Sequence, residues 1–489
     1  MLRIAYWSLS NADHRLDNGE SLQSLLPAGF HIPFQTFLCF IMSAVTSRLS
    51  EDQEKQLLSL FGQARLCLLY KASVHDYTAV DFHARCDRQG PTVTVAYNQS
   101  GFIFGAYVSK DYTKTTQDIN DDKAFLFSIH NDREKPVRVS STNGLYGFTN
   151  GDTGPNYGAL VFLHDNVAKA QSQPGTQYNF DPALMHGNDL ELAEFEVYRV
   201  EDCGGFLDKP WREIPWNSEG KCKELKEYVQ SSRPLINSVE KAKILLVGQV
   251  GSGKSSFFNS INSVFRGNVT GQAITGIAGT SLSTQFRTYN IKAGRGGKPL
   301  PVVLCDSMGL EEGLNAGLDV DDIPTILKGN VPDRYQFNPM VPLQSDNSAF
   351  YKSPGLKDRI HCVVYVMDAC KVKLLSPKLL EKLTAIRKKV NHIGVPQLVL
   401  LTKVDEACPL VNNDLTKVYY SHYIRKIMSE VSVCLGVPEG SVLPVKNYSR
   451  EVDLDLNMDI LLLSALVHMM RFTDNYFDDV SEEGLEKGD

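Results

Sequence analysis

One glycine-rich stretch in the middle of the chain strongly restricts the possible fold of the residues around it. Its sequence is Gly248-Gln-Val-Gly-Ser-Gly-Lys254-Ser255. This stretch matches the pattern G-x-x-x-x-G-K-[ST] at every fixed position. A strand-like apolar run at residues 243–247 precedes it, and a helix-like run at residues 255–265 follows it. We therefore predict a phosphate-binding loop between a strand and a helix, with a glycine-rich turn that binds no ligand as the alternative.

The residue types of this loop define its expected chemistry. Glycine lets backbone N–H groups close around phosphate oxygens, and the helix N-terminus adds a favourable dipole. Lys254 would reach the β- and γ-phosphates of a nucleotide, and Ser255 would ligate Mg²⁺. The predicted phosphate-binding residues are Gly248, Gly251, Ser252, Gly253, Lys254, Ser255 and Ser256.

A second motif, Asp306-Ser-Met-Gly309, ends the apolar run at residues 302–305. A carboxylate at that strand end can hold the magnesium ion, usually through water, and the Gly309 amide can sense the γ-phosphate. The next residue is Leu310, which cannot orient a water molecule as glutamine does in Ras-type enzymes. We therefore expect GTP hydrolysis to be slow, or to need a group supplied by a partner or by a second copy of the chain.

A third motif, Thr402-Lys403-Val-Asp405, ends the apolar run at residues 398–401. The Asp405 carboxylate can accept hydrogen bonds from the N1–H and the exocyclic amine of guanine, whereas adenine offers no such pair of donors. The stem of Lys403 would lie along the base. The three motifs in this order predict a site for GTP/GDP with Mg²⁺ rather than for ATP.

Two parts of this site have more than one candidate or a weaker signal. A switch threonine should lie between the first helix of this region and its second strand, where it closes on magnesium. Thr280 and Thr284 both fit, and Thr275 is a third candidate. Asn447, just after the apolar run at residues 442–445, is expected at the edge of the base. The predicted magnesium ligands are Ser255, Asp306 and Thr280.

The hydrophobic pattern divides the rest of the chain into two fold types. From residue 65 to about residue 200, short strands such as 92–97 alternate with turn residues, which predicts a β-sandwich. Within it, residues 194–200 alternate with period two, as in a strand with one solvated face. After residue 241, continuous apolar runs alternate with helical patterns, which predicts a mainly parallel sheet flanked by helices.

These patterns predict five segments along the chain. Residues 1–41 lack clear periodicity and are expected to be a poorly ordered extension. The β-rich domain spans 42–202, a linker or bracing segment with one short helix spans 203–238, and the nucleotide-binding domain spans 239–475. An acidic tail, 476–489, completes the chain and is expected to fray from about Asp474.

Composition excludes several classes of protein. The 489 residues carry a net charge of −7, which argues against a general nucleic-acid or anionic-membrane binder. The 10 cysteines are scattered without a Cys-x-x-Cys pair, which favours reduced thiols in a reducing compartment. No run of 18 apolar residues is present, so we expect no transmembrane segment and a cytoplasmic protein. The basic residues around residues 371–389, including Lys378 and Lys382, are expected to form a solvated helix face rather than a ligand site.

Several stretches also carry a family resemblance. The C-terminal half resembles the interferon-induced protein 44 family at residues 248–267, 304–310, 321–339, 356–369 and 400–405. The N-terminal half resembles a TLDc domain at residues 68–97, 104–109, 124–129 and 192–200. The resemblance begins near Met42, and it implies an interferon-induced, cytoplasmic GTP-binding protein that acts in antiviral or innate immune responses.

We therefore expect a nucleotide-dependent switch with weak GTPase activity, if it has any, whose partners are guanine nucleotide and unidentified proteins. A second copy of the same chain is one of the possible protein partners. The alternative is a non-catalytic interaction scaffold, in which the nucleotide site is static or empty and the TLDc domain makes the contacts.

Overall fold

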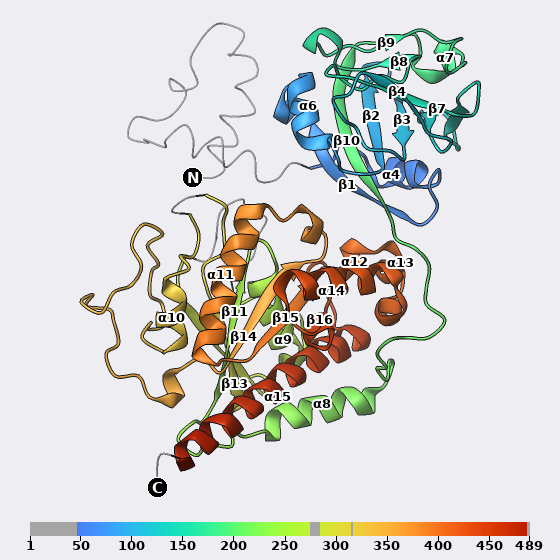
Figure 1. The fold of residues 1–489 in the computed structure, drawn as a ribbon. Helices are drawn as coiled ribbons and strands as arrows, with labels where there is room; N and C mark the ends of the chain where they lie inside the picture. Colours follow the sequence, from blue (N-terminus) through green and yellow to red (C-terminus); the bar gives the residue numbers. More distant parts are fainter. Residues whose placement is uncertain (1–45, 274–283, 314–315, 487–489) are drawn as a thin grey trace, which may run out of the picture. The chain divides into compact units, whose positions relative to one another are not determined.

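The computed structural model describes residues 46–273, 284–313 and 316–486. The predicted extension at residues 1–41 lies outside these ranges. Two six-stranded sheets organise the described chain, one before and one after the linker at residues 203–238 (Figure 1). We call residues 46–202 the N-terminal domain and residues 239–486 the C-terminal domain.

The sheet of the N-terminal domain is antiparallel throughout, in the order β1-β10-β2-β3-β5-β6. Its strands are β1 (Ala64–Lys71), β2 (Thr92–Asn98), β3 (Ile103–Val108), β5 (Phe125–Ile129), β6 (Val137–Ser140) and β10 (Leu192–Asp202). Four short strands form a second layer: β4 (Gln117–Asn120), β7 (Tyr146–Asn150), β8 (Leu160–Val161) and β9 (Gln171–Ser172). Phe148 and Phe162 of this layer pack with Phe104 of β3 in one apolar core, which confirms the predicted sandwich.

The opposite face of the same sheet is covered by α4 (Glu51–Leu58). The Ser50 hydroxyl accepts from the Gln53 amide, and the Gln53 side chain accepts from the Ser50 amide, so a capping box begins the helix. Leu57 then packs with Val93, Phe127 and their neighbours in a second core. Helices α5 (Ala72–His75), α6 (Ala79–Cys86) and α7 (Pro182–Met185) complete the domain.

Because both faces of the sheet are covered, the prediction of a solvated face on β10 is wrong. Glu194 and Glu196 are buried, although they alternate with apolar residues. Glu196 accepts hydrogen bonds from the hydroxyls of Tyr97 at 2.8 Å and Tyr198 at 2.5 Å, and it lies 3.0 Å from the ammonium of Lys71. These contacts compensate the carboxylate for the loss of water.

The sheet of the C-terminal domain has the order β12-β13-β11-β14-β15-β16, in which all pairs are parallel except the edge pair β12–β13. Its strands are β11 (Ala242–Gly248), β12 (Arg287–Lys292), β13 (Pro299–Asp306), β14 (Cys362–Asp368), β15 (Gln397–Thr402) and β16 (Val442–Pro444). Every residue of β14 is buried. The predicted mainly parallel sheet is therefore confirmed.

The helices of this domain cover the sheet in two groups. Helix α9 (Lys254–Arg266) contacts β11, β12 and β13, and α15 (Leu456–Glu486) contacts α9 and β14. Helix α11 (Pro377–Ile393) contacts both α10 (Asp322–Leu327) and α14 (His422–Leu435). The short helices α12 (Val404–Ala407) and α13 (Pro409–Asn413) follow β15.

The linker contains α8 (Glu219–Ser231), which packs along α15. Helix α15 also continues beyond Asp474, where the sequence predicts fraying, because Tyr476 and Phe477 are buried in the core. Within the described ranges, Leu456–Glu482 is long and apolar enough to cross a membrane, with a mean hydropathy of 1.2. Two thirds of that window (67%) is buried against the rest of the protein, as in a core helix.

Candidate functional site

The glycine-rich stretch forms the turn between β11 and α9, as the sequence predicts (Figure 1). Gly251 and Gly253 adopt φ values of 73° and 96°, in the region that glycine tolerates best. Gly248 lies directly against β14, because a Cβ atom there would be 2.2 Å from the Val366 carbonyl oxygen. The glycines therefore set the close packing of this loop on the neighbouring strand.

Lys254, the first residue of α9, is buried within this loop. Its ammonium donates to the carbonyl oxygens of Gly248 and Gln249, both at 3.0 Å. Burial lowers the pKa of Lys254, and the charge of Asp306 only partly opposes this effect. An anion bound in the loop would supply the negative charge that this lysine lacks.

Ser255 and Asp306 lie together beside the loop. The Ser255 hydroxyl donates to Oδ2 of Asp306 at 2.6 Å, which joins the start of α9 to the end of β13. Asp306 is buried at this strand end. A serine oxygen and a carboxylate at this separation fit a single hard cation such as Mg²⁺, held by oxygen ligands.

The third motif contacts the first at the end of β15. The Thr402 hydroxyl donates to the Ser252 carbonyl oxygen at 2.7 Å, although 150 positions separate the two residues. Lys403 follows with φ 57° and forms an ion pair of 2.7 Å with Asp368 at the end of β14. Burial lowers the pKa of Lys403, but the ion pair with Asp368 raises it, and the net effect is a raised pKa. The structure thus brings together two motifs that the sequence separates.

Asp405 and Asn447 lie at the same edge of the sheet. Burial raises the pKa of Asp405, and Lys446, 3.9 Å away, lowers it by a smaller amount. The Asn447 amide donates to the Gly253 carbonyl oxygen at 3.4 Å, so this side chain contacts the phosphate loop itself. Its predicted contact with the base edge stays a prediction.

The segment after β13 also touches the phosphate loop. The Leu310 amide donates to the Gly248 carbonyl oxygen at 2.9 Å, and the Leu310 side chain is buried. The buried leucine side chain cannot orient a water molecule, and slow hydrolysis stays a prediction. Thr275 and Thr280 lie outside the described residues. The Thr284 carbonyl oxygen accepts from the Phe337 amide at 3.1 Å.

Two residues at this site carry no signal in the sequence motifs. Asp368, the ionic partner of Lys403, ends a strand that has no motif of its own. Asn259 of α9 is buried, and its side-chain oxygen accepts from the amides of Gln272 and Ala273 at 2.9 and 2.8 Å. Asn259 therefore fixes the chain just before the segment of the threonine candidates.

Two buried polar atoms of the loop region are compatible with a bound ligand. Ser252 Oγ and Asn447 Oδ1 have no hydrogen-bond partner among the residues that the structure describes. Buried polar groups of folded proteins are normally paired, and a bound ligand could supply the partner that the described residues do not give these two atoms. A Cβ atom at Gly253 would lie 3.0 Å from Asn447 Nδ2, so even a methyl group would crowd this space.

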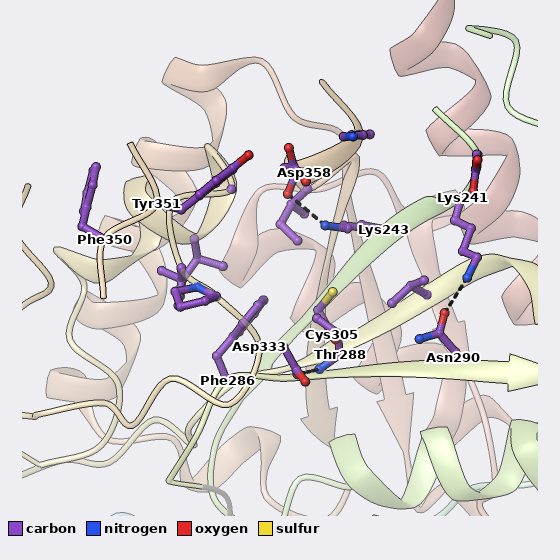
Figure 2. Close-up of a pocket in the computed structure, with 18 of the residues that line it drawn as sticks. Lys241, Lys243, Phe286, Thr288, Asn290, Cys305, Asp333, Phe350, Tyr351 and Asp358 are labelled. Carbon is purple, nitrogen blue, oxygen red and sulfur yellow. Dashed lines mark hydrogen bonds between the residues drawn. The ribbon is translucent and has the colours of Figure 1, made fainter. Parts of the chain in front are cut away.

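A cavity of about 800 Å³ lies elsewhere in the C-terminal domain (Figure 2). Lys241, Lys243, Phe286, Asp333 and Tyr351 are among the residues that line it. None of the predicted site residues is in its lining. This cavity is therefore separate from the predicted nucleotide site.

A mainly parallel sheet with a G-x-x-x-x-G-K-S loop between β11 and α9 and a Thr-Lys-x-Asp motif after β15 has the fold of a P-loop GTPase-type domain. The TLDc domain family model matches residues 43–201, which places a TLDc domain before it.

Human interferon-induced protein 44-like is 37% identical over 451 residues, covering 90% of this chain and 97% of that protein. Human interferon-induced protein 44 is 37% identical over 442 residues, covering 90% and 96%. The chain belongs to the interferon-induced protein 44 family, and the resemblance seen in the sequence is confirmed.

More distant similarities cover parts of the chain. MTOR-associated protein MEAK7 of Xenopus laevis is 21% identical over 206 residues, covering 40% of this chain and 44% of that protein. The solved structure of Toc33 from Arabidopsis thaliana, in complex with GDP and Mg²⁺, aligns with a TM-score of 0.31 at 14% identity. That alignment covers 52% of this chain and 91% of Toc33.

Proposed function

We propose that this protein is a magnesium-dependent GTP/GDP-binding switch of the cytoplasm that hydrolyses GTP slowly or with help from a partner. One observation carries the proposal: the Thr402 hydroxyl binds the Ser252 carbonyl oxygen at 2.7 Å. This bond joins the base motif to the phosphate loop, so that one nucleotide can occupy both. Bound Mg²⁺ would neutralise phosphate charge, and Ser255 and Asp306 are the described residues that would hold it.

The cellular role follows from the family and not from the site. Relatives that match most of this chain carry the name interferon-induced protein 44, which supports induction by interferon and a part in antiviral or innate immune responses. A matching TLDc-region relative is named as MTOR-associated, which supports a search for protein partners of the N-terminal domain. All nine cysteines in the described ranges are free thiols, which supports a reducing compartment.

Binding of fluorescent GTP, GDP and ATP, with and without magnesium, tests this function. We expect the full chain to bind GTP and GDP but not ATP, and Lys254→Ala to lose at least about tenfold in affinity, because a charge-assisted contact to phosphate is removed. No nucleotide binding by the unaltered chain would overturn the proposal and favour the scaffold.

Base selectivity can be tested by a change of specificity. Asp405→Asn replaces a pure acceptor with an amide that can donate, so we expect it to lose GTP and gain xanthosine triphosphate, whose base carries an oxygen in place of the guanine amine. Glu406→Gln is the matched control, since this neighbouring carboxylate is exposed. Equal effects of the two variants would show that Asp405 does not read the base.

A further inference from the structure

One lysine of α11 binds the loop that follows the Asp306–Gly309 motif. Lys382 Nζ donates to three backbone carbonyl oxygens, those of Glu311 at 2.7 Å, Gly313 at 3.3 Å and Ala316 at 3.4 Å. The side chain is partly buried by these contacts. Lys382 therefore departs from the solvated helix face that the sequence predicts, whereas Lys378, one turn earlier, is exposed.

The two ends of this loop are held together at its base. Leu310 and Gly317 form an antiparallel bridge, and the Leu318 amide donates to the Gly309 carbonyl oxygen at 3.0 Å. Three carbonyl oxygens between these ends, those of Glu311, Gly313 and Ala316, converge on a single ammonium group. Hydrogen bonds from a charged donor are stronger than neutral ones, so Lys382 contributes much of what fixes the loop.

The base of the loop lies directly on the phosphate loop. Leu310 is bridged to Gln249, and its carbonyl oxygen accepts from the Val250 amide at 3.4 Å. A Cβ atom at Gly309 would be only 2.7 Å from Cγ2 of Val250. A displacement of this loop would therefore move Gly309 relative to the bound phosphates.

We propose that Lys382 is a positioning residue of the nucleotide site, which holds Glu311, Gly313 and Ala316 so that the Gly309 amide faces a γ-phosphate. The inference rests on the proposed function and names a residue that none of the nucleotide motifs contains. GDP has no γ-phosphate, so Lys382 acts on GTP binding and leaves GDP binding unchanged. A lysine that served the fold alone would change both affinities together.

Affinities of fluorescent GTP and GDP in the presence of magnesium test this role in the full chain. Lys382→Met keeps a long apolar side chain and removes the three donors, and we expect it to weaken GTP binding by about tenfold with GDP unchanged. Lys382→Arg, which keeps a charged donor, should restore part of the loss. Lys378→Met on the same helix is the matched control and should bind both nucleotides as the unaltered chain does.

Two results would overturn the inference while leaving the proposed function intact. One is an equal loss of affinity for GTP and for GDP in Lys382→Met. The other is an unchanged affinity for both nucleotides in a Lys382→Met variant that melts at the parent temperature. If the unaltered chain binds neither nucleotide, the proposed function and this inference both fail.

Hydrogen exchange on the unaltered chain gives a second measurement that does not depend on the folding of a variant. The amides of residues 309–313 and 316–318 should be better protected with GTP than with GDP, because only GTP engages Gly309. Equal protection with both nucleotides would contradict the positioning role.

Discussion

Individual buried charged residues in the C-terminal domain affect both ligand binding and stability. Lys254 has its pKa lowered by burial, and its only described partners are two carbonyl oxygens and the nearby charge of Asp306. Burying a charge is costly unless it is paired. A bound phosphate would provide this pairing, so the folded state should be stabilised by nucleotide in proportion to its affinity.

Asp322, the first residue of α10, is a second buried charge, and its role is in stability. Burial raises its pKa to about 6 from an ordinary 3.8, while a hydrogen bond from the Leu343 amide opposes the shift. The folded state therefore binds the proton more tightly than the unfolded state does. As a result, stability from this group is present at acidic pH and is lost as pH rises through about 6.

We predict that Asp322→Asn, which cannot ionise, is more stable than the parent at pH 8 by about 1–3 kcal/mol. The gain should shrink as the pH falls below 6, where the parent carboxyl is itself protonated. Urea unfolding at pH 8 and pH 5 measures this difference. Asp321→Asn is the control, because that carboxylate is exposed and its pair with Lys389 contributes little. A gain independent of pH would show that burial does not hold the proton on Asp322.

At the scale of elements, the sequence correctly predicts those strands and helices that are determined by short-range sequence patterns. The strand at residues 92–97 and the strand–loop–helix around residue 248 are both present. Their signals are short-range: β-branched runs, glycines at turns and helical spacing. The motif residues Lys254, Asp306 and Thr402 likewise lie where strand ends place them.

What the sequence could not predict depends on partners far along the chain. The alternation at residues 194–200 is that of a half-exposed strand, and only Lys71 and Tyr97, from other strands, show that its glutamates are buried. Asp368 meets Lys403, and Lys382 meets Glu311, through tertiary packing that leaves no local pattern. The acidic composition after Asp474 predicts fraying, but buried Phe477 extends α15.

Helix α15 supplies the prediction at this scale, because its apolar length alone does not distinguish a core helix from a membrane span. Leu462 is fully buried, so Leu462→Ala should cost about 2–5 kcal/mol in the free energy of unfolding. Leu235→Ala is the control, since Leu235 is 60% exposed and should change stability by less than about 0.5 kcal/mol. Denaturant unfolding without detergent measures both variants. A harmless Leu462→Ala would contradict the packing of α15 in the core.

At the scale of the whole described chain, one carboxylate connects strand β10 with the C-terminal domain. Glu201 is buried, accepts a hydrogen bond from the hydroxyl of Tyr423 on α14, and lies 2.9 Å from Arg199 and 3.3 Å from Lys373. Arg65 of β1 is within 3.8 Å of the same carboxylate. Burial raises the pKa of Glu201, but the hydrogen bond from Tyr423 and the three cations together hold it below its ordinary value.

We predict that Glu201→Ala destabilises the protein by about 3–5 kcal/mol, because it leaves the partly buried cations Arg65 and Arg199 without their partner. Tyr423→Phe should cost less, about 1–3 kcal/mol, and the double variant should cost less than the sum of the two. Thermal unfolding of the single and double variants measures this coupling. Glu191→Ala, which breaks an exposed pair with Lys169, is the control and should have little effect. Strict additivity would show that Glu201 and Tyr423 do not act together.

The position of β11 between β13 and β14 has a consequence for how the site comes into being. Both neighbours of this strand are made after it, and β14 follows only after α9, β12, β13 and α10. Pairing between strands so distant along the chain is slow. A nascent chain that has emerged only as far as β13 would contain the whole phosphate-loop motif yet lack the strand on which Gly248 rests. The motif is therefore complete well before the surface around it is. Under the proposed function, nucleotide binding would report the last steps of folding.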